Sequence, residues 1–412
     1  MSLPLRSAFL STLLLPLAAS ADWPQILGPQ RNGQAAGETL LDQWPEAGPK
    51  KLWSQKLGEG YAGPAVAGDR VVVFHRVDNS ERVQAFDAAT GRSLWKTDFS
   101  ASYSGGYNPD RGPRCVPLIH KNRVYVFGAA GDLHAVDLAD GRKVWSYAAY
   151  EKLSGLEGYF GAGSTPIVAD EKLLVNVGGR NGAGLAAFSL KDGKLLWKVS
   201  DENASYSSPT QVTIDGQQHV IFVTRMNAVS VDPKTGAERF RFPFGQRGPT
   251  VNAATPLVFN KNLLFVTASY RVGGKLARID KQGAKEVWAD DETLSSQYAT
   301  AVYHRGHLYG CHGREDIGVA AFRCVEAATG KVKWSEEGVG VANVILAGDR
   351  MLLLTHRGEL MLAEASPEKF RKLAATRVAS EVTRALPALS GGKLYLRSNG
   401  SDNQLVCLQV GK

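Results

Sequence analysis

The stretch FDAATGRSLWK, residues 86–96, recurs in modified form along the chain. Copies read VDLADGRKVWS (136–146), FSLKDGKLLWK (188–198), IDKQGAKEVWA (279–289) and VEAATGKVKWS (325–335). Each copy joins a polar turn containing glycine to a strand that carries a tryptophan, and glycine suits such turns because it takes positive φ. Recurrence of one such unit predicts a repeat architecture.

The residues before each copy complete the repeating unit. In 63–98, an apolar stretch led by Pro64 precedes the turn Gly68-Asp69, and VVVF, a polar loop and VQAF follow. Short apolar runs separated by turn residues predict a four-stranded antiparallel meander. Equivalent starts recur at intervals of about 41 to 53 residues, which indicates a β-propeller; they lie at Val116, Thr165, Ser208, Thr255, Thr300, Ala342 and Leu386.

The last unit is incomplete at the C-terminal end. LYLRSNGSDNQLVCLQV (394–410) supplies middle strands and no outer strand, whereas KKLWSQKL (50–57) carries Trp53 ahead of the first unit. We infer an all-β, eight-bladed propeller over residues 50–412, in which the N-terminal strand completes the last blade and leaves no free sheet edge. Residues 22–49 are expected to form an extended leader.

The repeated turn has an architectural role. Asp87, Asp137, Asp232 and Asp280 are placed to accept backbone N–H bonds within their turns. The aromatic residue that follows is expected to wedge between neighbouring blades. Six of the eight positions hold tryptophan (Trp53, Trp95, Trp145, Trp197, Trp288 and Trp334), and Phe240 and Leu373 occupy the other two.

The first 21 residues have the features of an export signal. Arg6 precedes a short apolar run, and Ala19-Ser20-Ala21 fits the small-residue rule for cleavage after Ala21. We therefore expect a periplasmic or secreted protein. No stretch is long enough to span a bilayer. The net charge of +8 is dispersed without a basic run, which argues against nucleic-acid binding. A monomer is expected.

Cysteines and histidines give no catalytic or metal motif. Cys311 and Cys324 fall on neighbouring predicted strands, where either a cross-strand disulfide or two buried thiols fits. His304, His307 and His312 cluster in sequence, but the predicted strand directs them to opposite ends of a blade, so no shared metal is expected. We assign no catalytic and no metal-binding residue.

One face of the predicted ring collects arginines. They lie in loops between second and third strands or just before first strands: Arg76, Arg114, Arg180, Arg225, Arg271, Arg314, Arg357 and Arg384. Pre-strand positions nearer the axis hold Tyr61, Tyr159, Tyr206, Asn252, Tyr298 and Asn343. Arginine binds carboxylate and phosphate bidentately, so this mouth is a candidate site for an anionic small molecule, an acidic glycan or an acidic envelope partner. The alternative is that each arginine is only solvated or pairs with a local acid such as Glu315.

The A-F-D-x-x-T-G-x-x-x-W pattern, together with the Thr-Pro and Ser-Pro strand starts, resembles the pyrroloquinoline-quinone (PQQ) type of propeller repeat over roughly residues 50–412. The opening WPQILGPQRNG (23–33) is similar to a leader of exported bacterial proteins of this type, and Trp23 is expected to pack on the propeller. This superfamily contains quinoprotein dehydrogenases, which hold PQQ and Ca²⁺ over the axis, and cofactor-free BamB-like scaffolds.

The choice between these classes depends on site residues. The resemblance implies that a dehydrogenase needs oxygen ligands for Ca²⁺ and a basic aspartate, and many carry adjacent cysteines. This chain has no adjacent cysteines, no CxxCH and no matching set of ligands. We therefore predict a non-catalytic binding or scaffold propeller without a committed cofactor. A PQQ-dependent dehydrogenase acting on an alcohol or sugar is the alternative, followed by a carbohydrate-handling accessory protein.

Overall fold

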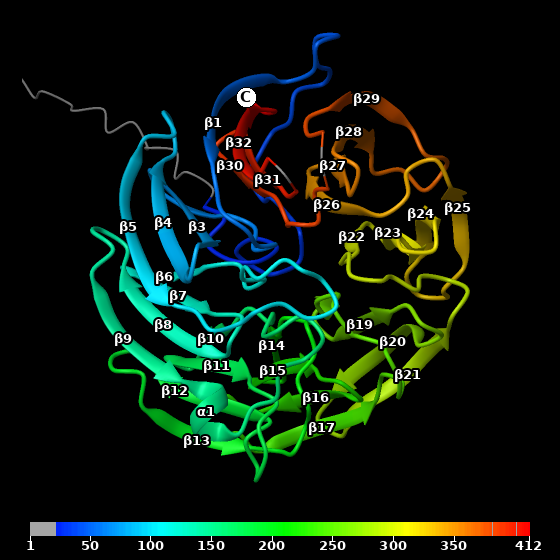
Figure 1. Ribbon diagram of the computed structural model, residues 1–412. Helices are drawn as coiled ribbons and strands as arrows, with labels where there is room; N and C mark the ends of the chain where they lie inside the picture. Colours follow the sequence, from blue (N-terminus) through cyan, green and yellow to red (C-terminus); the bar gives the residue numbers. More distant parts are fainter. Residues whose placement is uncertain (1–21, 381, 401) are drawn as a thin grey trace, which may run out of the picture.

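The computed structural model describes residues 22–380, 382–400 and 402–412; the predicted export signal and its cleavage site lie outside them. Within these residues the strands form eight four-stranded antiparallel sheets, arranged as the blades of a ring (Figure 1). The fold is therefore an all-β, eight-bladed propeller, as predicted from the repeat. Among the described residues, no helix is both long and apolar enough to cross a membrane.

Blades 1 to 4 each run from the axis to the rim in chain order (Figure 1). Blade 1 contains β2 (Ala65–Ala67), β3 (Arg70–Val77), β4 (Ser80–Asp87) and β5 (Ser93–Ser100), and blade 2 contains β6 (Leu118–His120), β7 (Arg123–Phe127), β8 (Asp132–Asp137) and β9 (Lys143–Ala148), followed by the short helix α1 (Ala149–Leu153). Blade 3 contains β10 (Ile167–Ala169), β11 (Lys172–Asn176), β12 (Leu185–Ser189) and β13 (Leu195–Val199), and blade 4 contains β14 (Thr210–Ile214), β15 (Gln217–Val223), β16 (Asn227–Val231) and β17 (Glu238–Pro243).

Blades 5 to 7 continue in the same order. Blade 5 contains β18 (Leu257–Phe259), β19 (Leu263–Ala268), β20 (Gly273–Asp280) and β21 (Gly283–Asp290), and blade 6 contains β22 (Val302–His304), β23 (His307–Arg314), β24 (Val319–Glu326) and β25 (Val332–Glu336). Blade 7 contains β26 (Ala342–Ala347), β27 (Arg350–Thr355), β28 (Glu359–Glu364) and β29 (Lys372–Arg377).

Blade 8 combines strands from the two ends of the chain. It contains β30 (Ala388–Ser390), β31 (Lys393–Ser398), β32 (Gln404–Gln409) and, as its outermost strand, β1 (Lys50–Lys56). The β1–β32 pair is antiparallel, with Lys50 opposite Gln409 and Trp53 opposite Cys407.

The tryptophans join neighbouring blades. Each indole N–H donates to a backbone carbonyl in the turn of the next blade, over 2.9–3.2 Å: Trp53 to Ala88, Trp95 to Leu138, Trp145 to Leu190, Trp197 to Pro233, Trp288 to Ala327 and Trp334 to Ser366. The predicted aspartates also accept backbone N–H groups inside their turns, for example Asp87 from Thr90 at 2.8 Å. The repeat motif is thus the joint that fixes one blade against the next.

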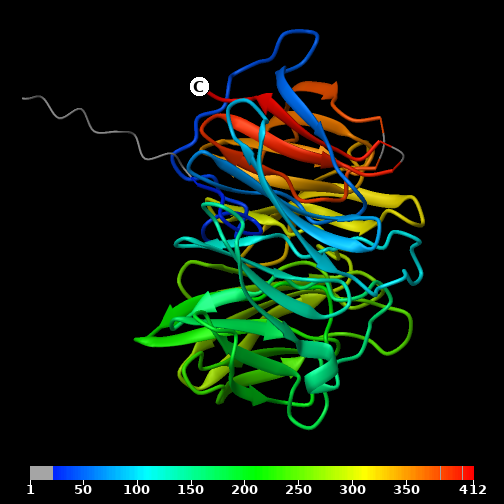
Figure 2. The same ribbon diagram turned by 60° about the vertical axis from the view of Figure 1, so that its left-hand side comes forward.

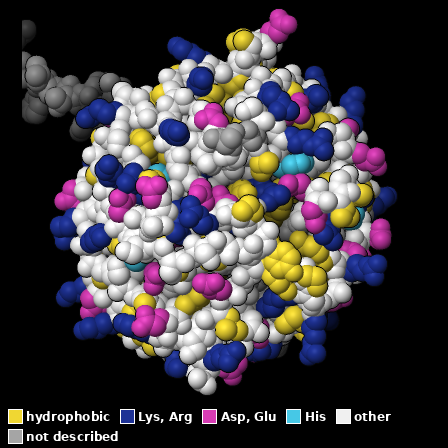
Figure 3. All heavy atoms as spheres, viewed as in Figure 1, with side chains coloured by type: hydrophobic (Ala, Val, Ile, Leu, Met, Phe, Trp, Pro, Cys, Tyr) yellow, Lys and Arg dark blue, Asp and Glu magenta, His cyan; other side chains and the backbone are white. Residues whose placement is uncertain are grey.

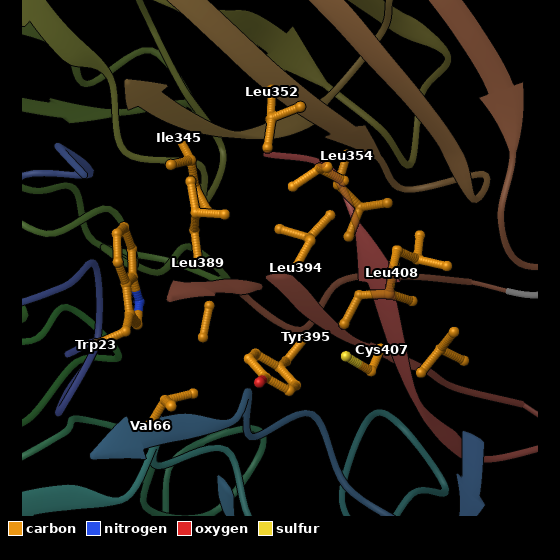
Figure 4. Close-up of a cluster of buried hydrophobic side chains, with 14 of the residues drawn as sticks. Trp23, Val66, Ile345, Leu352, Leu354, Leu389, Leu394, Tyr395, Cys407 and Leu408 are labelled. Atoms are coloured by element: carbon orange, nitrogen blue, oxygen red, sulfur yellow. The ribbon is translucent and has the colours of Figure 1, made fainter. Parts of the chain in front are cut away.

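Apolar side chains fill the spaces between blades. Figure 4 shows the largest cluster, in which Trp23 of the leader packs beside Val66, Leu389 and Tyr395 from blades 1 and 8. Trp23 is 2% exposed, so it packs on the propeller, as expected. All four cysteines are buried and free, so Cys311 and Cys324 are thiols.

The ring has two distinct faces. The connections between second and third strands and between blades lie on one face, called here the mouth face. The turns between first and second strands and between third and fourth strands lie on the other, the turn face. The leader (22–49) runs along the turn face, and Figure 2 shows it on the side opposite the long loop that follows β5.

Candidate functional site

A pocket of about 250 Å³ lies on the propeller axis and is reached from the mouth face. We call it the axial pocket. Aromatic and aliphatic side chains make up most of its wall, and a few amides and two arginines supply polar groups. Figure 3 shows the face viewed in Figure 1, where hydrophobic and charged side chains mix around the centre. The lining residues are Ile26, Tyr61, Asn108, Arg114, Val116, Phe160, Gly163, Tyr206, Ser208, Val251, Ala253, Tyr270, Gln297, Tyr298, Asn343, Arg384 and Leu386.

Two guanidinium groups approach the Tyr61 ring at the wall of the pocket. The guanidinium carbon of Arg114 is 5.7 Å from the Tyr61 ring centroid, and that of Arg384 is 5.9 Å from it. Both distances are within the range of cation–π attraction. The Tyr61 hydroxyl accepts a hydrogen bond from Nδ2 of Asn108 at 3.1 Å, which fixes the ring. These contacts hold both arginines at the pocket.

Both arginines also have an acidic neighbour. Nη2 of Arg384 donates to Oε1 of Glu315 at 2.6 Å, and the Tyr298 hydroxyl donates to the other oxygen at 2.5 Å. Arg114 lies 3.6 Å from Asp110 and donates to two backbone carbonyls. The sequence suggested pairing with a local acid, but Glu315 pairs with Arg384, 69 positions away, and its neighbour Arg314 pairs with Asp316. With these acidic neighbours, Arg114 and Arg384 alone do not make the pocket strongly cationic.

Two further arginines lie buried behind the same wall. The guanidinium of Arg397 is fully buried and donates to the carbonyls of Gly58, Ala62 and Phe74. Burial lowers its pKa to about 10, so it stays protonated at neutral pH. Arg76 is 4% exposed and likewise donates to carbonyls only. Carbonyl dipoles satisfy these donors without cancelling their charge, which leaves a positive excess beside the pocket.

A buried carboxyl faces this group of arginines. Glu81 on β4 is 2% exposed, and its Oε1 accepts the backbone N–H of Ala129 at 2.8 Å. Burial raises the pKa of Glu81 to about 7, against smaller lowering effects of that hydrogen bond and of Arg76. Glu81 is therefore only partly ionised at neutral pH and offsets part of the positive charge.

One protein family has a sequence model that matches most of this chain. The model of the family described as "Outer membrane protein assembly factor BamB" matches residues 41–200, 79–336 and 185–411. Together these overlapping matches extend over nearly all of the described propeller. The chain belongs to the BamB family.

The chain is similar in sequence or in fold to individual BamB proteins and to a quinohemoprotein dehydrogenase. The outer membrane protein assembly factor BamB of Shewanella oneidensis is 24% identical over 274 residues, which are 61% of this chain and 64% of that protein. The matched segment thus spans less than two thirds of that relative. The BamB crystal structure from Moraxella catarrhalis has a TM-score of 0.63 at 15% identity, covering 87% of this chain and 97% of that one. The quinohemoprotein alcohol dehydrogenase from Comamonas testosteroni has a TM-score of 0.70 at 15% identity, covering 95% and 81%, and shares the fold.

In this BamB-family chain, six of the fourteen residues predicted for the mouth line the axial pocket. They are Tyr61, Arg114, Tyr206, Tyr298, Asn343 and Arg384. Five of them precede the first strand of a blade and Asn343 lies at the start of β26, and these strands converge on the axis. Whether they bind a ligand stays a prediction.

The other eight predicted residues lie elsewhere. Arg76 belongs to β3 and is buried, because that strand continues to Val77 and leaves a very short turn. This placement differs from the exposed loop expected from the sequence. Asn252 is also buried, and its amide donates to the carbonyls of Thr224 and Phe244.

The remaining six predicted residues lie in or beside the loops of the mouth face, outside the axial pocket. Arg225 donates a hydrogen bond to the Thr250 hydroxyl in a neighbouring loop, and the Tyr159 hydroxyl donates to the carbonyl of Gly248. Arg314 pairs with Asp316 and stacks over Tyr270 at 4.3 Å. The last three are exposed, namely Arg180, Arg271 and Arg357. None of the six arginines predicted in loops between second and third strands lines the pocket.

Sequence reasoning also missed several lining residues. Phe160, Ser208 and Gln297 lie in the same pre-strand segments as the predicted tyrosines, so their position relative to the strand starts was an available signal. Ile26 comes from the leader and Tyr270 from a β19–β20 turn. No repeat position marks these two, because they enter the pocket through tertiary folding.

The histidines of blade 6 do not share a ligand position. His307 begins β23 and contacts the carbonyl of Arg305, while His312 near the end of β23 accepts the backbone N–H of Ser295. His304 lies 2.9 Å from Asp349. Within residues 22–412, apart from 381 and 401, His, Cys, Asp and Glu side chains form no group of three arranged to hold a metal ion.

The pocket residues do not fit calcium-bound PQQ. Ca²⁺ requires six to eight oxygen ligands, several of them usually carboxylates. Carboxylates that contact lining residues are already engaged: Glu315 by Arg384 and Tyr298, Asp110 by Arg114 and the backbone N–H groups of Gly60 and Gly112, and Asp316 by Arg314. A cation placed there would have to displace an arginine. The donor set thus disagrees with the cofactor of quinoprotein dehydrogenases.

Proposed function

We propose that this chain is an exported, non-catalytic scaffold of the cell envelope that contributes to outer-membrane protein assembly. Membership of the BamB family supports this proposal, as does the engagement of the pocket carboxylates in ion pairs. The envelope location agrees with the export signal predicted for residues 1–21.

Deletion of the gene from the source cell tests the assembly role. We expect the amount of folded outer-membrane barrel protein, measured by its heat-modifiable migration in gel electrophoresis, to fall and to recover when the wild-type chain is supplied. An unchanged amount in the deletion strain, with normal folding kinetics of newly made barrel proteins, would overturn the proposal.

We further propose that the axial pocket binds an anionic group carried on an apolar or aromatic body. The observation that carries this proposal is the Arg114–Tyr61–Arg384 arrangement beside an aromatic wall. The buried guanidinium groups of Arg76 and Arg397 add positive charge behind it. Such a group could belong to a small molecule, a glycan or a partner's side chain, since all three present the same chemistry.

The fluorescent aromatic anion 8-anilinonaphthalene-1-sulfonate (ANS) provides a direct probe of the pocket. Arg384→Gln should weaken ANS binding at least about fivefold, because it removes a cation from the wall and leaves the carboxylate of Glu315 behind it without its ion-pair partner. Arg357→Gln is the matched control: it removes the same charge from an exposed position on the mouth face outside the pocket, and we expect less than about a twofold change. Equal effects of the two substitutions would refute the assignment.

A further inference from the structure

The leader crosses the channel on the turn face and is fixed on both sides of the axis. Trp23 forms an antiparallel bridge with Val66 of blade 1. Gln34 bridges Leu346 on β26 of blade 7, and its side chain donates to the carbonyl of Tyr303 in blade 6 at 3.1 Å. These attachments leave residues 24–33 to span the channel between the two sides.

Arg31 anchors this span inside the ring. It is 2% exposed, and its Nη1 donates to the carbonyl of Pro209 at 2.8 Å and to that of Thr165 at 3.3 Å. Nη2 donates to the carbonyl of Pro166, and Nε to Oε1 of Gln25 at 2.8 Å. Pro166 and Pro209 immediately precede β10 and β14, the innermost strands of blades 3 and 4.

The backbone of the span is shaped to make this insertion. Leu27 and Arg31 both have positive φ, 58° and 54°, which costs free energy for residues with a side chain. Gly28 has φ 82°, and a Cβ there would lie 3.0 Å from the Trp23 ring. Burial also lowers the pKa of Arg31 to about 9, which leaves it charged at neutral pH. The hydrogen bonds to inner-strand carbonyls compensate these costs.

The same span contributes to the axial pocket. Ile26 lines it, and Ile26 packs with Leu27 and Val116 against Leu386. The described lining residues otherwise come from the blades and the loops between them. Ile26 therefore lies where the channel would continue toward the turn face.

We propose that the leader is an internal plug that makes the axial pocket blind, and that Ile26 sets the length of ligand which the pocket accepts. Arg31 is the positioning residue that holds the plug against blades 3 and 4. This inference rests on the proposed ligand-binding role of the axial pocket. The inference adds a ligand class, namely an anionic group on an apolar body. Such a ligand enters from the mouth face and reaches Ile26 with its apolar end.

Phenylalkanoates of increasing chain length, used to displace ANS, measure the depth of the pocket. Affinity should rise about fourfold for each added methylene until the chain reaches Ile26, and then level off or fall. Ile26→Ala should extend this limit by one or two methylenes, and Ile26→Phe should shorten it. Gln30→Ala is the matched control in the leader, because Gln30 is exposed and outside the pocket.

Thiol labelling gives a readout of the plug itself. In Ile26→Cys, bound ANS should slow reaction with methyl methanethiosulfonate at least about tenfold, since the plug closes the other end. Adding Arg31→Met should abolish most of that protection, whereas Arg31→Lys should retain more of it. The four native cysteines are buried, so the wild-type chain supplies the background rate. Thermal melting verifies that each variant is folded at the labelling temperature.

The outcomes separate the two proposals. If Arg384→Gln weakens ANS binding but the length limit is unchanged in both Ile26 variants, the plug inference is overturned and the pocket assignment stands. If ANS binding is insensitive to Arg384, the pocket assignment itself is overturned. If ANS still protects the thiol of Ile26→Cys in folded protein that also carries Arg31→Met, the anchoring role of Arg31 is refuted.

Discussion

The indole of Trp145 in blade 2 lies so close to Gly193 in blade 3 that a Cβ on that glycine would be 2.6 Å from the ring. The Trp145 N–H also donates to the carbonyl of Leu190 in the same turn at 3.1 Å. A glycine at φ 70° therefore provides both the turn and the surface on which the preceding blade rests. Equivalent contacts join Trp53 to Gly91 and Trp95 to Gly141.

Replacement of this tryptophan should destabilise the ring. Trp145 is 9% exposed, so Trp145→Ala is expected to lower the free energy of unfolding by about 3–5 kcal/mol. Trp145→Phe keeps most of the packing, and the Leu190 carbonyl still accepts the Tyr125 hydroxyl, so a loss of about 1 kcal/mol is expected. Denaturant unfolding measures both values, and equal losses would show that packing contributes little.

The glycine can be tested separately from the tryptophan. Gly193→Ala must place a Cβ against the Trp145 ring at positive φ, whereas Gly216→Ala has φ 78° and no atom within 4 Å of the new Cβ. Gly216→Ala thus reports the backbone cost alone, about 1–2 kcal/mol. We expect Gly193→Ala to cost about 1–3 kcal/mol more. Unfolding free energies of the two variants that agree within error would contradict the steric explanation.

Glu81 should make stability depend on pH. Its pKa is raised to about 7 in the folded chain, so between its unfolded pKa and pH 7 the folded state binds more protons, and stability falls as the pH rises. Glu81→Gln removes this effect. From pH 5 to 7.5, the wild type should lose about 2 kcal/mol relative to that variant.

The comparison of variants is needed because buried histidines act in the opposite direction. Burial lowers the pKa of His75 and of His134 to about 3, so their contribution is lost as the pH falls below the unfolded value of about 6.5. Denaturant unfolding of both proteins at the two pH values gives the double difference. A double difference near zero would mean that Glu81 titrates normally.

Addition of PQQ and Ca²⁺ tests the mismatch between the pocket and the quinoprotein cofactor. Because Glu315 and Asp110 are engaged by arginines, we expect no quinone absorbance shift and no dye-linked oxidation of alcohols or sugars. An authentic quinoprotein dehydrogenase reconstituted in parallel serves as the positive control. A saturable absorbance shift that is abolished by a calcium chelator would restore the dehydrogenase interpretation.

Only some of the residues around the mouth could be placed correctly from the sequence. Tyr61, Tyr206 and Tyr298 could be placed near the axis, because each lies in the segment just before a first strand and the repeat fixes that geometry. Arg76 could not, because its burial depends on the carbonyls of Ala101 and Tyr103 in a loop of irregular length. The pairing of Arg384 with Glu315 joins residues 69 positions apart, which no local pattern reveals.

The sequence by itself determined the ring of blades, since a turn, a glycine and a tryptophan recur at intervals that local strand and turn preferences can interpret. Only the tertiary structure decided what the ring encloses. Arg31 and Ile26 look like ordinary residues of a short leader, and they become an anchor and part of a pocket because folding brings them to inner strands of distant blades. Repeats encode contacts between neighbours, whereas a site on the axis is built from non-repeating residues that meet only when the ring is complete.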